Sequence, residues 1–270
     1  MLAKGIKAAL VAGVAAAAVS ATAHAAAIQV TVTNNANVGG LTLSPLWVGF
    51  HNGGFDLFDD GAAASNGLEL LAELADASGL GAELAATQGS AVGGVIGTGG
   101  IPPIEPGETG TAVFDLDPTD NRFFSFASMV VPSNDAFIGN PDLIELFTAG
   151  GDFVGDIVIT ILGGQIWDAG TEINDPFAGG AFLPGVDATI SPEENGVVGL
   201  HTGLNELAGV VAANGEGLVL SEIDFLNNPN LPVATITISS VPVSEPGLIG
   251  LLGLAGLGLA GAGLRRRVIA

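Results

Sequence analysis

The sequence predicts an all-β domain, an antiparallel β-sandwich with one or two short helices, between two terminal segments that serve export. Short apolar stretches, some with period-2 alternation, recur along residues 26–244, and turn residues separate them. No regular alternation of strands with helices is present. The 219 residues from 26 to 244 are enough for one large sandwich with a well-buried core.

Six segments of the body are expected to be strands. Residues 28–33 alternate with period 2, and the densely apolar segment 123–131 should be the central strand. Pro45 marks its strand as an edge or a bulge. The turn residues of 117–121 predict a hairpin loop between two strands. The six segments are residues 28–33, 41–50, 111–116, 123–131, 153–162 and 233–240.

One helix is expected after residue 65. Asn66 can cap it, and Glu69 follows at the spacing of a capping box. One face of this helix would be apolar, formed by Leu68, Leu71, Ala72 and Ala75. The stretch 89–100 is rich in Gly and lacks charge, which predicts a flexible loop.

The charge of the body limits its partners. The chain has 28 acidic and 6 basic residues, and residues 26–244 hold 27 of the acids but only Arg122, a net charge of −26. Nothing there could neutralise phosphates, which argues against nucleic acid and disfavours anionic lipid headgroups. The charge fits solubility, cation binding or contact with a cationic surface. Because Cys is absent, disulfides and thiolate metal sites are ruled out.

The two ends of the chain are typical of targeting segments. Residues 1–25 have the pattern of a secretory signal peptide, with Lys4 and Lys7 before an apolar run and Ala-His-Ala at 23–25, so the mature chain should begin at Ala26. Residues 247–264 contain no polar side chain and would form a helix of about 27 Å, close to the hydrocarbon thickness of a membrane. The arginines at 265–267 then predict a cytoplasmic C-terminus.

The C-terminal segment 245–270, with the short motif before it, resembles the bacterial PEP-CTERM sorting signal. The resemblance rests on Val-Ser-Glu-Pro at 243–246, the apolar span and the arginine cluster. Ser244 stands where the usual Pro-Glu-Pro motif has its first Pro. The resemblance implies a Gram-negative cell envelope, membrane attachment through the C-terminal helix before processing, and processing by an exosortase.

Motifs of catalysis are largely missing. No Gly-x-Ser-x-Gly and no His-Glu-x-x-His occurs. His51 follows a predicted strand, so it could line a site or simply be a loop or partly buried histidine bonded to backbone. The acidic group from Asp115 to Asn121 is not an EF-hand loop, because Asp120 and Phe126 occupy the positions that require Gly and Glu.

Two further motifs resemble the spondin domain. They are Ser-Met-Val-Val-Pro-Ser-Asn-Asp-Ala-Phe-Ile-Gly at 128–139 and Trp-Asp-Ala-Gly-Thr-Glu at 167–172. Residues 45–52, 55–59 and 68–73 resemble the bacterial branch of the family, and the resemblance covers about residues 28–240. It implies a C2-like β-sandwich with a Ca²⁺ site at one end of the sheets, whose ligands would be Asp135, Asp168 and Glu172. Glu172 stands where the family commonly has Asp.

The predicted loops agree with such a site. Asp135 follows a buried strand, and Asp168 and Glu172 flank a Gly turn after the next long strand, so the two loops can converge at one end of a sandwich. Ca²⁺ takes six to eight oxygen ligands, and it would turn the repulsion between two carboxylates into attraction. Acids that merely cap turns are the alternative.

Together these observations predict a non-enzymatic, exported protein of the cell envelope or extracellular matrix. Its role would be Ca²⁺-dependent adhesion or interaction with matrix or polysaccharide, and the matrix role comes from the resemblance alone. A secreted hydrolase acting on polysaccharide is the alternative. The few aromatic residues (13 Phe, two Trp and no Tyr) and the missing nucleophile motifs stand against it.

Overall fold

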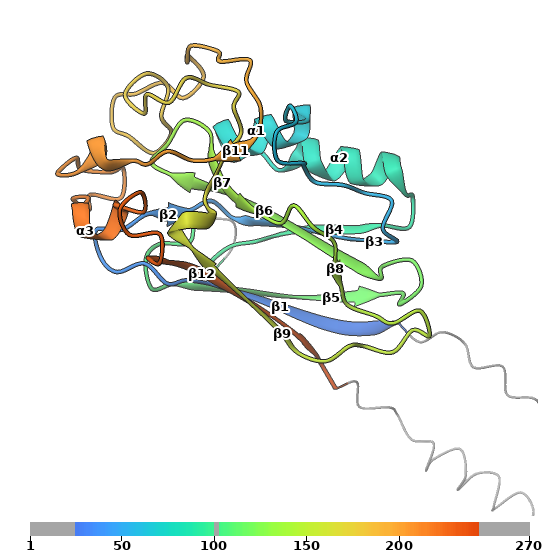
Figure 1. Cartoon of the computed structure of the whole chain (residues 1–270). Coiled ribbons are helices and arrows are strands. Elements are labelled where there is room, and N and C mark those ends of the chain that lie inside the picture. The colour runs from blue at the N-terminus through green and yellow to red at the C-terminus, as the bar shows by residue number, and fades with distance from the viewer. Residues whose placement is uncertain (1–24, 100–102, 243–270) are drawn as a thin grey trace, which may run out of the picture.

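Two antiparallel sheets packed face to face form a β-sandwich in the computed structural model, which describes residues 25–99 and 103–242 (Figure 1). The smaller sheet has four strands in the order β5-β1-β12-β9. Its first and last strands along the chain, β1 and β12, pair over seven residues from Ile28↔Ser240 to Asn34↔Ala234. The strands are β1 (Ala26–Asn34), β5 (Thr109–Leu116), β9 (Ile157–Leu162) and β12 (Pro232–Ser240).

The larger sheet has eight strands in the order β11-β10-β7-β6-β3-β4, with β2 and β8 also paired to β6. The central position predicted for residues 123–131 is confirmed, because β6 pairs with four other strands. The strands are β2 (Thr42–Leu43), β3 (Leu46–His51), β4 (Val92–Ile96), β6 (Phe123–Val131), β7 (Ala136–Gly139), β8 (Ile144–Glu145), β10 (Trp167–Asp168) and β11 (Gly199–Leu200).

Glycine-rich chain forms a strand where a flexible loop was predicted. Val92–Ile96 is β4 and pairs with β3, so the prediction is wrong for these residues. Space explains their composition: a Cβ on Gly94 would lie 2.7 Å from the Phe114 ring of the facing sheet, and one on Gly93 would lie 3.2 Å from Leu84. Glycine in a strand marks such a close approach.

The predicted hairpin at 117–121 is a crossing between the two sheets. β5 belongs to the smaller sheet and β6 to the larger, so the strands on either side do not pair. Asn121 holds the crossing in place, since its buried amide Nδ2 donates to the carbonyls of Phe50 (3.2 Å) and Ser90 (3.0 Å). A local turn pattern predicts the bend but not the sheet that the chain enters next.

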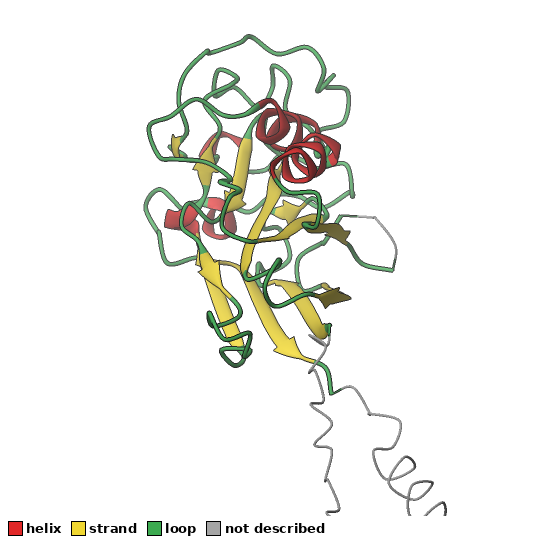
Figure 2. Ribbon diagram, turned by 90° about the vertical axis from the view of Figure 1, so that its right-hand side faces the viewer, coloured by secondary structure: helices red, strands yellow, loops and turns green. Residues whose placement is uncertain are grey.

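Two apolar layers hold the domain together. The inner layer fills the space between the sheets and includes Ile28, Phe50 and Phe124. The outer layer lies between the larger sheet and two helices, α1 (Asn66–Leu74) and α2 (Ser78–Thr87), which cover its outer face (Figure 2). A fully buried Phe or Leu side chain contributes about 1.5–3 kcal/mol, so the outer layer fixes α1 against β6 and β7.

The cap of α1 differs from the predicted one. The N-cap is Ser65, whose Oγ accepts the N–H of Leu68, and Glu69 takes no part in a capping box. Glu83 of α2 instead accepts the N–H of Gly67 (2.8 Å) and the hydroxyl of Ser65 (2.8 Å). The sequence did not predict α2 because Gly79 and Gly81 disfavour a helix. A short third helix is α3 (Leu220–Ile223).

The predicted targeting segments lie almost wholly outside the described residues. These begin at residue 25 and end at residue 242, so the signal peptide, the sorting motif and the apolar span 247–264 remain predictions. Within the described part of the chain, no helix combines the length and the apolar character that crossing a membrane requires.

Candidate metal centre

Three buried side chains meet at the β7-β10-β11 edge of the larger sheet. One carboxylate oxygen of Asp135, one of Asp168 and a ring nitrogen of His201 lie within 4.8 Å of one another. We call these three residues the metal group. Two of the three predicted ligands, Asp135 and Asp168, are therefore brought together, and His201 joins them.

Neighbouring strands place each member of the metal group. Asp135 immediately precedes β7, whose first residue, Ala136, pairs with Asp168 in β10. Asp168 also pairs with Gly199 of β11, and the N–H of His201 donates to the Ile166 carbonyl (2.9 Å). Sheet pairing thus gathers residues that are up to 66 positions apart in the sequence.

The Asp135 carboxylate is held from one side only. Its Oδ2 accepts the backbone N–H groups of Thr171 (3.1 Å) and Glu172 (3.2 Å), whereas its buried Oδ1 has no hydrogen-bond partner. Burial and then the negative charge of Asp168 raise the pKa of Asp135 to about 7. A divalent cation at Oδ1 would remove both penalties on the charged form.

Asp168 is fixed by the turn that follows it. Its Oδ1 accepts the N–H of Gly170 (2.7 Å), and its Oδ2 accepts the amide of Asn174. Gly170 adopts φ +67°, and a Cβ there would lie 2.4 Å from the Val197 carbonyl oxygen. Since each carboxylate oxygen has two lone pairs, Asp168 can still bind a cation.

The two described histidines each begin a local turn of the same type, but their Nε2 atoms have different surroundings. In His51-Asn52-Gly53 and His201-Thr202-Gly203, the glycine N–H donates to Nδ1 of the histidine (3.1 and 3.0 Å). A neutral ring with this acceptor at Nδ1 carries its proton on Nε2. His51 contacts Ser125 Oγ through Nε2 (3.1 Å), whereas Nε2 of His201 is buried without a partner.

This turn argues against His51 as a general base and against His201 as a metal ligand. A protonated Nε2 of His51 cannot accept a proton from Ser125, which is itself buried. Burial lowers the pKa of His51 to about 4. A protonated Nε2 of His201 cannot ligate a metal, but it can donate to the carboxylates beside it. Burial lowers the pKa of His201, and the charge of Asp168 opposes that shift.

The donor set of the metal group fits a hard cation that binds oxygen. Asp135 Oδ1 is buried and lacks a hydrogen-bond partner. Unpartnered buried oxygens are costly, and a bound cation would satisfy them. The metal group could hold a metal ion, with Asp135 and Asp168 as its carboxylate ligands and other oxygens completing the shell.

The third predicted ligand, Glu172, lies outside the metal group. Its backbone N–H supports Asp135, but its side chain lines a pocket of about 420 Å³ with three other glutamates. Burial raises the pKa of Glu172 to about 7, and the charges of Glu73, Asp135 and Glu69 add to this. Its assignment as a Ca²⁺ ligand stays a prediction. We call Glu69, Glu73, Glu172 and Glu193 the acidic pocket.

Sequence reasoning missed His201 and three members of the acidic pocket. His201 shares its His-x-Gly pattern with His51, so nothing local marks it as the residue beside the carboxylates. Glu69 was interpreted as a capping residue, Glu73 lay in the 68–73 stretch of the family resemblance but was given no role, and Glu193 belonged to no motif. The i, i+4 spacing of Glu69 and Glu73 was the one available signal, because like charges at that spacing destabilise a helix.

Comparison with known proteins gives one family match. The model of the family described as Spondin_N matches residues 37–182, which are 146 of the 270 residues. The match includes Asp135, Asp168 and Glu172 and ends before His201. A search of curated proteins finds no match.

Proposed function

Because the chain belongs to the Spondin_N family, we propose that it is an exported interaction or adhesion protein stabilised by Ca²⁺ at the metal group. The observation that carries the Ca²⁺ part is the pair of buried carboxylates, Asp135 and Asp168, with Asp135 Oδ1 lacking any partner. The family membership supports the interaction part. Matrix or polysaccharide remains the proposed partner.

The chemistry of the donors favours Ca²⁺ over the other common divalent ions. Zn²⁺ prefers thiolate and imidazole ligands, but the chain has no Cys and the His201 tautomer withholds its nitrogen. Mg²⁺ demands a near-ideal octahedron and keeps several of its waters. Ca²⁺ accepts carboxylates, carbonyls and water in flexible numbers, which suits the buried carboxylates of Asp135 and Asp168.

A metal bound here would act as a structural clamp. Asp135 precedes β7, Asp168 ends β10, and the 170–172 turn donates to both carboxylates. The cation would neutralise the repulsion between the two acids and lock that turn to the sheet. Residues of this turn also line the acidic pocket, so a bound cation would fix the geometry of the pocket as well.

The decisive experiment compares Asp168→Asn with Asp117→Asn. Binding to the folded state alone adds about 2.7 kcal/mol at a hundredfold excess over Kd, so wild type should melt about 5–10 °C higher in Ca²⁺ than in chelator. Asp168→Asn should shrink this shift to the small one that Mg²⁺ gives. Asp117 lies in the crossing between the sheets, so Asp117→Asn should keep the full shift. Equal behaviour of the two variants would show that the acids attract cations only diffusely.

The location of the protein in the cell is part of the same proposal. We expect the chain to be membrane-held through residues 247–264 before exosortase processing, with the body outside the cytoplasm. Fractionation of the full chain should place it with membranes, and a chain ending at Ser244 should be recovered in the soluble fraction. Equal recovery of both in the soluble fraction would remove the anchor from the proposal.

A further inference from the structure

The acidic pocket is built from two parts of the chain that approach across the outer layer. Glu69 and Glu73 lie one turn apart on α1. Glu172 and Glu193 face each other across an antiparallel bridge, which the hydrogen bonds Ile173 N–H to Pro192 O (2.9 Å) and Glu194 N–H to Thr171 O (2.8 Å) support. These two elements bring four carboxylates to the wall of one pocket.

The charges of this pocket reinforce one another. Burial raises the pKa of Glu73, a hydrogen bond with Thr171 opposes that shift, and the nearby charges of Glu69 and Glu193 add to it. Two glutamates at i and i+4 on α1 also destabilise that helix slightly. The arrangement therefore costs free energy unless the carboxylates take up protons or a positive group enters the pocket.

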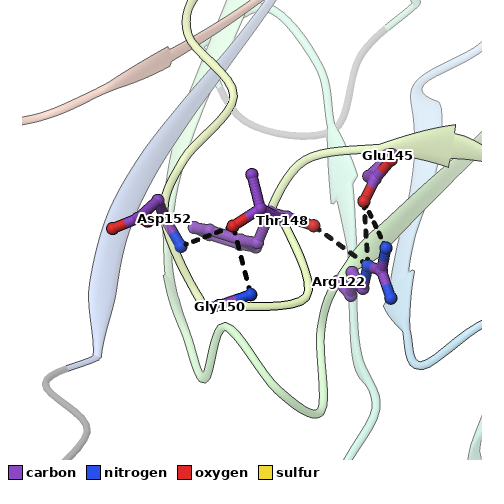
Figure 3. Close-up of polar contacts among 6 residues, drawn as sticks. Arg122, Glu145, Thr148, Gly150 and Asp152 are labelled. Carbon is purple, nitrogen blue, oxygen red and sulfur yellow. Dashed lines mark hydrogen bonds and ion pairs between the residues drawn. The ribbon is translucent and has the colours of Figure 1, made fainter.

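No cation of the body can fill that role. Arg122 is the one Lys or Arg between residues 8 and 264. Its guanidinium donates to Glu145 Oε1 (3.0 and 2.5 Å) and to the Phe147 carbonyl (3.0 Å), as Figure 3 shows for its pairing with Glu145. Because these partners occupy Arg122, the positive charge must come from outside the body.

Two polar side chains of the pocket have atoms that make no hydrogen bond of normal geometry. Glu172 is only 6% exposed, and its Oε2 has no hydrogen bond. The hydroxyl of Ser191, which lines the same pocket, lies close enough to lower the pKa of Glu172, yet its Oγ makes no hydrogen bond of normal geometry. A buried carboxylate oxygen and a buried hydroxyl left unpaired each cost free energy. These atoms indicate a ligand that supplies hydrogen-bond donors as well as charge.

The spacing excludes a compact metal site. Among the described residues, three candidate ligands lie within 4.8 Å of one another in the metal group. The four glutamates of the pocket form no such close set. A volume of about 420 Å³ also far exceeds one ion, because a water molecule occupies about 30 Å³. The pocket suits a larger cation that reaches several carboxylates at once.

We propose that the acidic pocket receives the guanidinium group of an arginine side chain of a partner polypeptide. Five N–H donors in a planar fork can bind two carboxylates and a hydroxyl together, whereas an ammonium group offers three donors at one point. The proposal rests on the interaction function for its biological sense, but it does not require an ion at the metal group.

The experiment measures binding of N-acetyl-argininamide to the full chain by NMR titration, in Ca²⁺ and in chelator. N-acetyl-citrullinamide, of nearly the same shape without the charge, is the control ligand. Argininamide should bind and citrullinamide should not. Glu73→Gln and Glu193→Gln should each weaken argininamide about tenfold, the effect of losing one charge-assisted hydrogen bond. Glu216→Gln, at an exposed glutamate outside the pocket, should leave the affinity unchanged.

The proposal would be overturned if argininamide and citrullinamide bound equally well, or if Glu216→Gln weakened argininamide as much as Glu73→Gln does. It would also be overturned if Ca²⁺ displaced argininamide from wild type and Glu73→Gln abolished that displacement, because the pocket would then be a second metal site. The Ca²⁺ melting shift of Glu73→Gln separates this proposal from the previous one. That shift should equal the wild-type shift whether or not argininamide binds.

Discussion

The metal group and the acidic pocket are both made of carboxylates, lie next to each other and share the 170–172 turn, yet they are built differently. In the metal group, backbone N–H groups of the turn hold Asp135 and Asp168 close together in a buried place. In the acidic pocket, side chains from α1 and from the bridge at Glu193 surround a wider opening. Acids held by backbone donors suit a bare ion, and acids spread around a space suit a cation with many donors.

The largest expected effect comes from breaking the element that both regions share. Gly170→Ala puts a Cβ 2.4 Å from the Val197 carbonyl oxygen at φ +67°, so we expect a loss of about 2–4 kcal/mol of stability together with the Ca²⁺ shift and argininamide binding. Thermal melting and the NMR titration measure the three effects.

Gly215→Ala is the matched control for that change. Gly215 has φ +85° but nothing within 4 Å of a Cβ, so only the backbone strain, about 1 kcal/mol, remains. Both binding responses should persist in this variant. Similar behaviour of the two alanine variants would mean that the turn does not organise either region.

The second expected effect is a pH dependence that belongs to the metal group. The folded state raises the pKa of Asp135 from 3.8 to about 7, so without metal it binds that proton more tightly than the unfolded chain does. Stability in chelator should therefore fall as pH rises from about 4 to about 7. Saturating Ca²⁺ should remove much of this fall, because the ion replaces the proton.

Asp135→Asn identifies the source of the pH dependence. The variant should reduce the fall of the melting temperature in chelator between pH 4 and 7, whereas Asp117→Asn should follow wild type. The fall that remains should come from Glu172, whose pKa is also raised to about 7. General repulsion among the 27 acids of the body acts equally in both variants. A slope that Asp135→Asn leaves unchanged would assign the pH dependence to Glu172 and to that general repulsion.

A third variant decides to which region Glu172 belongs. Because its side chain lines the acidic pocket, Glu172→Gln should weaken argininamide by about tenfold and keep most of the Ca²⁺ melting shift. Loss of the whole Ca²⁺ shift, as in Asp168→Asn, would instead make Glu172 the third ligand that the resemblance implies.

The smallest effect should come from His201→Gln. Glutamine keeps an N–H donor, and the Gly203 N–H at Nδ1 indicates that Nε2 of His201 carries a proton and is no metal ligand. The Ca²⁺ shift should fall by no more than about a third, and Zn²⁺ should stabilise wild type no more than Mg²⁺ does. A large Zn²⁺ shift that His201→Gln abolishes would identify a nitrogen-ligated metal site.

Several parts of the fold follow from local patterns in the sequence. Period-2 alternation predicted β1, the segment 233–240 was also expected to be a strand and is part of β12, and the dense apolar run of β6 predicted its central place. Local patterns failed where a long-range contact decides the structure. β4 is a strand because its glycines fit against Phe114 and Leu84, and the segment after Asp117 crosses to the other sheet because Asn121 is anchored there.

The candidate site divides in the same way. Asp135 and Asp168 were identified through family motifs, and sheet pairing does bring them together. His201 arrives through β11, a two-residue strand that no periodicity can reveal. Glu69, Glu73 and Glu193 converge only because α1 packs on the outer layer, so their neighbourhood depends on tertiary packing rather than on spacing along the chain.

The pairing of the first and last strands has a mechanical consequence. β12 lies between β1 and β9 and ends beside the start of β1, at the opposite end of the molecule from β11 (Figure 1). If the chain is tethered beyond residue 242 while a partner grips the acidic pocket, tension runs along β12. Hydrogen bonds on both sides of that strand would then be sheared together instead of being unzipped one by one. With an anchor and a bound partner both in place, the sandwich would bear load along the full length of this strand.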